Sequence, residues 1–228
     1  MSTASSMMQG ARASAGFAIG AFMFGLVFGS TAIALGMPAD QSLVMSATAF
    51  AGAAQFSALP LWSHPLPYLA IAISVALVST RNILMGLSLS ADFRQAPWPL
   101  RLLAIFTLVD ASWALAMRER GRAELTAFFC GSSMTLYVSW MVGVLLGNLL
   151  PEMLDPVTVA AIGFGGVIFL ALVLVLLAKN PVGPRLPWAV SALVAVVLSY
   201  VAAPHFILLG AVGAGALSSV LMRRRVRD

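Results

Sequence analysis

The stretch PYLAIAISVALVSTRNILMGLSL, residues 67–89, decides the fold class. It is long enough to cross a bilayer, because a helix needs about 20 mostly apolar residues to span the hydrocarbon core. Arg81 lies near its middle, where a guanidinium is costly and persists only if it is paired or faces water. The stretch therefore predicts a membrane helix that carries a charge for a structural or functional reason.

The composition of the whole chain agrees with a membrane protein. Of its 228 residues, 61% are hydrophobic and 9% are charged, whereas soluble domains carry about 25% charged residues. The apolar runs are continuous, without the alternation in roughly ten-residue pieces that is typical of a membrane β-barrel. We therefore expect an all-α, polytopic membrane helix bundle of about eight spans, some of them short or broken.

Breaks at proline, glycine and charged residues delimit the expected spans. The apolar run from Phe17 to Leu35 is too long for the core of a signal peptide, about 7–15 residues, so we interpret it as a retained first span. The expected organisation is a cytoplasmic segment 1–15, one transmembrane domain 16–222 and a basic cytoplasmic tail 223–228. The eight candidate spans lie near 16–35, 41–61, 67–89, 102–117, 125–150, 157–177, 187–202 and 205–222.

Arginine in short loops predicts the orientation, because such residues favour the cytoplasmic side. If all eight candidates cross, Arg94 and Arg101 face one side. The remaining basic residues outside the spans face the other side, which predicts that both termini are cytoplasmic. The net charge of +5 is thus explained by helix orientation, and we expect a lipid bilayer rather than nucleic acid as the environment of this chain.

Several classes of function find no support in the sequence. Cys130 is the single cysteine, and His64 and His205 are far apart, so neither a disulfide within the chain nor a zinc site is expected. Lys179 is the single lysine and lies in no phosphate-binding loop. We expect no metal, no cofactor and no enzymatic activity, which leaves secondary transport as the first hypothesis.

A faint internal repeat points the same way. Gly25 and Gly29 precede a proline and an aspartate before the next apolar run, and Gly143 and Gly147 do the same about half a chain later. Duplicated halves are common in transporters, although such glycine pairs also arise easily in membrane sequences.

Two opposite charges in neighbouring spans form the main candidate site. The planar guanidinium of Arg81 matches a carboxylate, and Asp110 lies in the next apolar run. Burial favours the protonated form of a carboxylate, while a nearby cation opposes it. Asp110 is therefore a candidate for binding an ammonium group or for proton coupling. We expect both charges to share one dehydrated cavity near the bilayer midplane; a permanent structural ion pair is the alternative.

Other polar and small residues are expected beside these charges. Thr48 and Gln55 are seven residues apart and are predicted to share one helical face, with Gly52 between them. Gln55 and Asn82 would orient a ligand, or alternatively hold helices together. Further candidates for an apolar side-chain pocket are Phe50, Phe56, Met85 and Trp113.

Three stretches resemble the AzlC-type branched-chain amino acid permeases. They are 46–56 (SATAFAGAAQF), 79–89 (STRNILMGLSL) and 110–113 (DASW). The resemblance covers essentially the whole chain and implies that Gln55, Arg81 and Asp110 are motif positions. The sequence has Ser79, Asn82 and Ala111 where the family is expected to have Asn, His and Glu. Without that histidine and that acid, we expect no proton relay through positions 82 and 111.

The resemblance also implies a function. It suggests export of small apolar amino acids such as valine from a bacterial cell through its inner membrane, together with a small AzlD-type membrane subunit. A proton or ion gradient is the expected driving force. Two alternatives stay open: a channel or facilitator for another small molecule, and a membrane scaffold or sensor that transports nothing.

Overall fold

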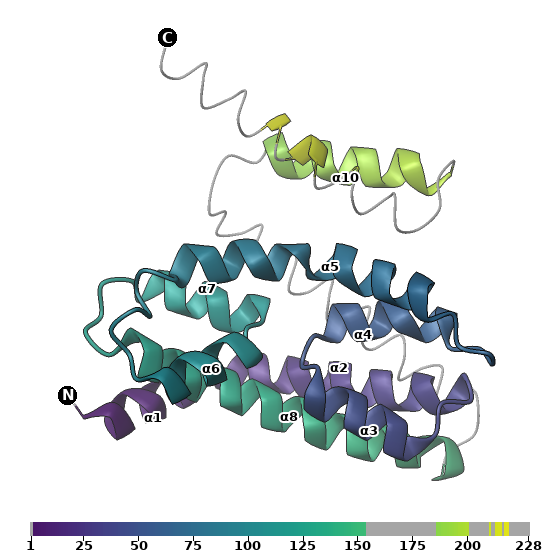
Figure 1. Cartoon of the computed structure of the whole chain (residues 1–228), viewed down its shortest axis with the longest axis horizontal. Helices are drawn as coiled ribbons and strands as arrows, with labels where there is room; N and C mark the ends of the chain where they lie inside the picture. Colours follow the sequence, from purple (N-terminus) through teal and green to yellow (C-terminus); the bar gives the residue numbers. More distant parts are fainter. Residues whose placement is uncertain (1, 154–185, 201–209, 211–212, 216, 219–228) are drawn as a thin grey trace. The chain divides into compact units, whose positions relative to one another are not determined.

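The computed structural model describes residues 2–153, 186–200, 210, 213–215 and 217–218 (Figure 1). These residues are helical or lie in turns and loops, and they contain no strand. They belong to two compact units, divided after Val167. The elements are α1 (Thr3–Ala13), α2 (Ala15–Ala34), α3 (Ala39–Thr48), α4 (Gly52–Ala58), the 3₁₀ turn η1 (Leu59–Leu61), α5 (Tyr68–Leu89), α6 (Trp98–Phe106), α7 (Asp110–Arg118), α8 (Leu125–Met153) and, in the second unit, α10 (Leu186–Ser199).

Three helices of the first unit are long and apolar enough to cross a membrane. They are α2, α5 and most of α8, and they correspond to the first, third and fifth spans expected from the sequence. In the second unit α10, with its apolar core 189–198, falls on the seventh expected span. The sixth expected span and most of the eighth lie outside the described residues.

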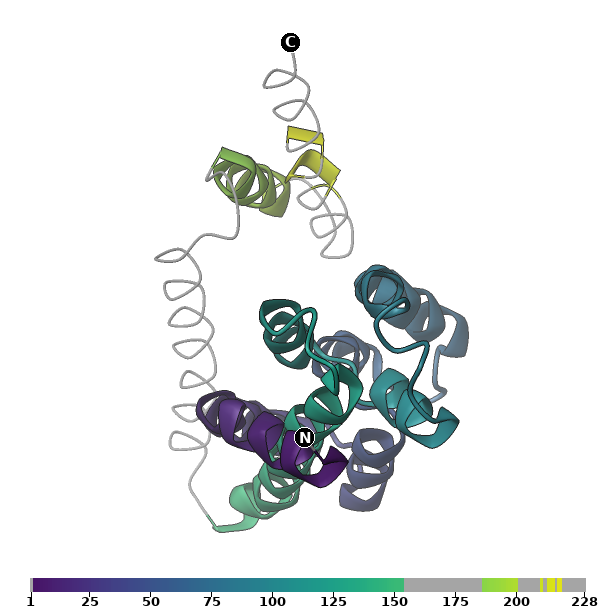
Figure 2. The same cartoon turned by 90° about the vertical axis from the view of Figure 1, so that its left-hand side faces the viewer.

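Helices α1 and α2 pack along α8 in the first unit (Figure 2). Glycines let their backbones touch: a Cβ placed on Gly25 would lie 2.3 Å from the carbonyl oxygen of Trp140, and one on Gly143 would lie 2.2 Å from that of Phe22. Earlier in the chain, Gly10 of α1 packs in the same way against the carbonyl of Phe128. Residue numbers therefore rise together along α1–α2 and along α8. The α2–α8 pair is therefore parallel and tightly packed through small residues.

The second expected span, 41–61, is not a single crossing helix. Helix α3 runs antiparallel to α8: Ser42 at its start donates a hydrogen bond of 3.0 Å to Asn148 Oδ1, and the carbonyl of Ala47 near its end accepts one of 3.1 Å from the Tyr137 hydroxyl. The chain then leaves the helical conformation at residues 49–51.

Helix α4 runs back toward the end from which α3 came. Gln55 Nε2 donates to Ser46 Oγ at 3.0 Å, a contact between residues placed almost symmetrically about the break. The C-terminal end of α4 then meets the beginning of α5, where Ser74 Oγ donates to the carbonyl of Ser57 at 3.4 Å. The pair α3–α4 is thus a re-entrant hairpin, a segment that returns to the end it started from.

The fourth expected span, 102–117, is a second re-entrant hairpin. Helix α6 runs parallel to α8, because Cys130 Sγ lies 3.4 Å from the carbonyl oxygen of Leu100 while Thr107 and Ser133, further along both helices, share a hydrogen bond of 2.7 Å. The chain breaks at residues 107–109, and α7 returns beside α5. Hydropathy could not reveal either hairpin, since a helix that turns back halfway is as apolar as one that crosses.

The hairpins start from opposite ends of the unit, and this corrects the expected sidedness of the loops. Arg94 and Arg101 were expected opposite Arg120. However, Arg120 binds Asp92, two residues from Arg94, and Leu100 lies beside the start of α8. We call this the arginine-rich end; near it lie Arg12, Arg94, Arg101, Arg118, Arg120 and Arg122.

Candidate functional site

The break between α6 and α7 places a carboxylate partway along the helices. Thr107 ends α6, and its hydroxyl donates to the carbonyl of Leu103 at 2.7 Å. Val109 is extended, and its N–H donates to Ser112 Oγ at 3.2 Å, which caps the new helix. Asp110 is consequently the first residue of α7, where a negative charge complements the helix dipole.

Arg81 and Asp110 form an ion pair across α5 and α7. The Nη1–Oδ2 distance is 3.0 Å, and the two side chains are 51% and 59% exposed within the described structure. The structure thus brings together the two charges that the sequence selected. In a bilayer, however, half-exposed charges cannot face lipid and must be met by water or by other protein.

A hollow of about 410 Å³ lies next to this pair, between α5 and α6. Asn82 lines it, directly after Arg81, and Leu108 lines it two residues before Asp110. Neither member of the ion pair belongs to the lining, so the expectation that both charges share one enclosed cavity is not met by this hollow. Its lining is Asn82, Ile83, Gly86, Leu87, Ser90, Phe93, Arg101, Ala104, Ile105 and Leu108.

The break between α3 and α4 separates the candidates of the second expected span. Gln55 is 1% exposed, and its Oε1 has no hydrogen-bond partner in the described structure. Thr48 is exposed and bonds back to the carbonyl of Val44 at 2.7 Å. The prediction that Thr48 and Gln55 share a helical face is therefore wrong, because heptad spacing has meaning only within one uninterrupted helix.

Aromatic side chains fill the space around the first break. Phe56 makes edge contacts with Phe24 and Phe28, with ring centroids 6.1 and 5.6 Å apart. The ring of Trp140 lies against Gly52, where a Cβ would be 2.9 Å from its Cη2 atom. Gly52 and Phe56 therefore lie in a packed aromatic cluster.

Tyr137 on α8 connects the two hairpins. Its hydroxyl donates to Ala47, and its ring contacts Phe50 at 5.2 Å and Phe106 at 5.9 Å between centroids. These partners lie at the tips of the α3–α4 and α6–α7 hairpins, so both tips meet at one side chain. Sequence analysis did not select Tyr137, although a tyrosine inside an apolar helix signals a hydroxyl that must find a partner.

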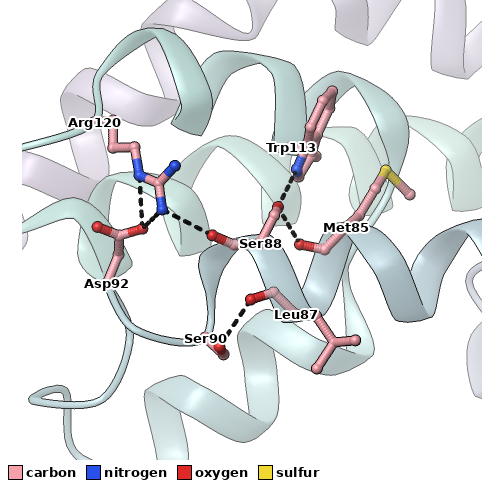
Figure 3. Close-up of polar contacts among 7 residues, drawn as sticks. All are labelled: Met85, Leu87, Ser88, Ser90, Asp92, Trp113 and Arg120. Carbon is pink, nitrogen blue, oxygen red and sulfur yellow. Dashed lines mark hydrogen bonds and ion pairs between the residues drawn. The ribbon is translucent and has the colours of Figure 1, made fainter. Parts of the chain in front are cut away.

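A second polar cluster ties the end of α5 to α7 and to the loop that follows it (Figure 3). Arg120 binds Asp92 at 3.1 Å and donates to the carbonyl of Ser88 at 3.0 Å. Trp113 Nε1 donates to Ser88 Oγ at 2.9 Å. Met85, a candidate for an apolar pocket, lies buried in the core beside this cluster, and its carbonyl accepts the Ser88 hydroxyl at 2.7 Å.

These features define a helical membrane protein with re-entrant segments and an ion pair that joins one of them to α5. The chain belongs to the AzlC family: residues 16–154 match the family described as AzlC protein. This is a family of membrane transport type.

Two curated relatives, both named "Uncharacterized membrane protein", come from Helicobacter pylori. The protein of strain ATCC 700392 / 26695 is 30% identical and that of strain J99 / ATCC 700824 is 31% identical, each over 134 residues. Each match covers 58% of this chain and 58% of the relative's own length. No solved structure matches this chain.

Proposed function

We propose that this protein is a secondary transporter that exports small apolar amino acids, such as valine, through the inner membrane of a bacterial cell. Arg81 binds the substrate carboxylate, and Asp110 binds its ammonium group or exchanges a proton with the coupling gradient. The ion pair of 3.0 Å between Arg81 on α5 and Asp110 at the start of α7, directly after the break, carries this proposal. Discontinuous helices at the level of paired charges are the usual substrate sites of secondary transporters.

The ion pair supplies the two groups that a zwitterion needs. With no substrate bound, the guanidinium and the carboxylate satisfy each other; an amino acid that enters between them replaces one ion pair by two. The half-exposed state of both side chains leaves them accessible for this exchange. Gln55, Asn82, Gly52, Thr48, Phe56 and Met85 have supporting roles in the proposal, and Asn82 has the most direct one because it lines the adjoining hollow.

A small AzlD-type subunit is the proposed partner, and helix α5 gives a physical reason for it. Only 6% of the apolar window of α5 is buried, and Tyr68, Leu69 and Leu84 are each more than 60% exposed. Arg81 lies on the same helix. A second membrane protein against this helix would cover both the apolar surface and the exposed charges, which lipid cannot do.

The N-terminus is proposed to be cytoplasmic. The described arginines other than Arg81 gather at the arginine-rich end, where α1 also lies. Short basic segments favour the cytoplasmic side of a membrane. The C-terminal tail, which was expected to be cytoplasmic as well, lies outside the described residues.

The test is flux of labelled valine in proteoliposomes that contain this protein with its small subunit, with and without a pH gradient. We expect gradient-driven flux in the wild type and no flux in Arg81→Gln, with the variant still folded by size-exclusion chromatography. Arg94→Gln, an exposed loop arginine, is the charge-matched control and should transport normally. Normal rates in Arg81→Gln would refute the assigned role.

A facilitator for another small molecule is the second candidate, and the two re-entrant hairpins favour it. Irregular backbone at membrane depth is tolerated where it is buried in protein or lines a water-filled path. Segments that enter from opposite ends and meet at Tyr137 suit such a path. Valine flux that follows its own concentration difference and ignores every ion gradient would select this candidate.

A further inference from the structure

We propose that the hollow between α5 and α6 is a loading site on the arginine-rich side. It would hold a carboxylate on a compact apolar body before that molecule reaches Arg81 and Asp110. This inference rests on the proposed transport function and adds a second binding station with Arg101 as its anion-binding group.

The hollow leads from the arginine-rich end toward the ion pair. Ser90 and Arg101 line it near the loop that joins α5 to α6, whereas Asn82 and Leu108 line it one to three turns deeper. The deep residues directly adjoin Arg81 and the break before Asp110. A solute bound in the hollow would therefore contact residues that are close to the Arg81–Asp110 pair in the sequence.

Arg101 is available for a ligand. Arg81, Arg120 and Arg122 each form an ion pair with an acidic residue. Arg101 has no such pair in the described part of the chain, and its side chain is exposed. It is also the arginine that lines the hollow. Its guanidinium can hold a carboxylate through two parallel hydrogen bonds.

The rest of the lining suits an apolar body. Between the polar ends, the walls are formed by side chains such as Ile83, Leu87 and Ile105. A volume of about 410 Å³ lies within the usual range for small-molecule sites, which are mostly apolar with a few polar groups that fix orientation. The lining offers a cation and neutral polar groups but no carboxylate, so it recognises an acid rather than an amine.

Gly86 lines the hollow, so a substitution at this position can change the volume of the hollow. A Cβ on Gly86 would lie 3.6 Å from Leu108 Cδ2, an ordinary contact, so the backbone accepts a side chain there. A leucine at this position would extend into the hollow and fill it. Gly16 on α2, where a Cβ meets nothing within 4 Å, provides a matched glycine-to-leucine control outside the hollow.

The probe is 3-methylbutanoate, which is valine without its ammonium group. It retains the carboxylate and the apolar body that the hollow recognises but lacks the group assigned to Asp110. Binding to the purified protein at millimolar concentration is measured by saturation-transfer difference NMR, with empty detergent micelles as the blank.

We expect binding to the wild type and to Arg81→Gln, and a loss of affinity of about tenfold or more in Arg101→Gln, because a charge-assisted hydrogen bond is removed. Gly86→Leu should lose binding, while Arg94→Gln and Gly16→Leu should retain it. In valine flux, Arg101→Gln should raise the KM for substrate supplied on the arginine-rich side and leave the maximal rate unchanged.

Three outcomes would overturn the loading site. One is unchanged binding of the probe in both Arg101→Gln and Gly86→Leu. Another is loss of probe binding in Arg81→Gln alone. The third is an anionic phospholipid that native mass spectrometry finds retained by the wild type and released by Arg101→Gln, since the hollow would then be a lipid site. Failure of the proposed transport function has a different result: the wild type shows no valine flux, whether or not the probe binds.

Discussion

At the scale of single residues, the ion pair between Arg81 and Asp110 can serve the structure or bind a substrate. The pair, with an Nη1–Oδ2 distance of 3.0 Å, either fixes the register of α5 against α7 or forms the binding site of a zwitterionic substrate. These two roles differ in what happens when the charges are exchanged.

Exchange of the two charges separates the two roles. The double variant Arg81→Asp with Asp110→Arg restores an ion pair of opposite polarity. We expect it to fold like the wild type and to transport no valine, because carboxylate and ammonium would each meet the wrong position and the guanidinium would move to another helix. Recovery of flux in the double variant, after loss in both single variants, would establish a structural pair instead.

Both charges of this pair were predictable from the sequence, since each interrupts an apolar run and membrane charges are rarely without a reason. Tyr137 and Arg101 were not predicted as site residues. A tyrosine and an arginine near the start of an apolar helix are ordinary in a membrane protein. The significance of Tyr137 comes from its hydrogen bond to Ala47, 90 positions earlier in the sequence, and that of Arg101 from its place in the lining of the hollow.

At the scale of elements, the parallel pair α2–α8 is the scaffold on which both hairpins rest. The glycines of the faint repeat, Gly25 and Gly29 on one helix and Gly143 and Gly147 on the other, lie in this interface. The repeat therefore has a packing role, whatever its origin. Small residues are needed there because the backbones themselves are in contact.

An added methyl group at this interface should destabilise the protein. In Gly143→Ala the new Cβ would lie 2.2 Å from the carbonyl oxygen of Phe22, so the helices must separate, at a cost of about 1–3 kcal/mol typical of overpacking. Gly16→Ala, which has open space, should be neutral or slightly stabilising. Melting temperatures in detergent compare the two, and equal melting temperatures would contradict the assigned packing.

The helices long and apolar enough to cross a membrane were predictable from the sequence, but the re-entrant hairpins were not. Residues 49–51 and 107–109 contain no proline and no charge, so nothing local marks the breaks. Hydrogen bonds to distant residues stabilise the breaks: the Tyr137 hydroxyl donates to the carbonyl of Ala47, and the hydroxyls of Ser133 and Thr107 share a hydrogen bond. Such tertiary partners determine where an apolar run turns back, and hydropathy does not report them.

At the scale of the whole molecule, the hairpins change which loops share a side. With both hairpins re-entrant, the loops that contain Gln95 and Glu119 lie at the arginine-rich end, while Asp40 and Ser63 lie at the opposite end of the first unit. The distribution of arginines across the two sides becomes more one-sided than eight crossings would give. This agrees better with the rule that basic loops stay in the cytoplasm.

Cysteine accessibility tests this topology. Single cysteines introduced as Gln95→Cys, Glu119→Cys, Asp40→Cys or Ser63→Cys, in a Cys130→Ala background, are treated in intact cells with a membrane-impermeant maleimide. We expect the first two to be protected together and the last two to be labelled together. Labelling that separates position 95 from position 119 would restore a crossing fourth span and remove the second hairpin.

The meeting of both hairpin tips at Tyr137 has a consequence for the proposed transport function. Each hairpin enters the first unit from its own end and reaches only as far as this side chain. If the protein transports as proposed, a small displacement of one tip from Tyr137 would open one end of the unit at a time, without a rocking movement of its halves.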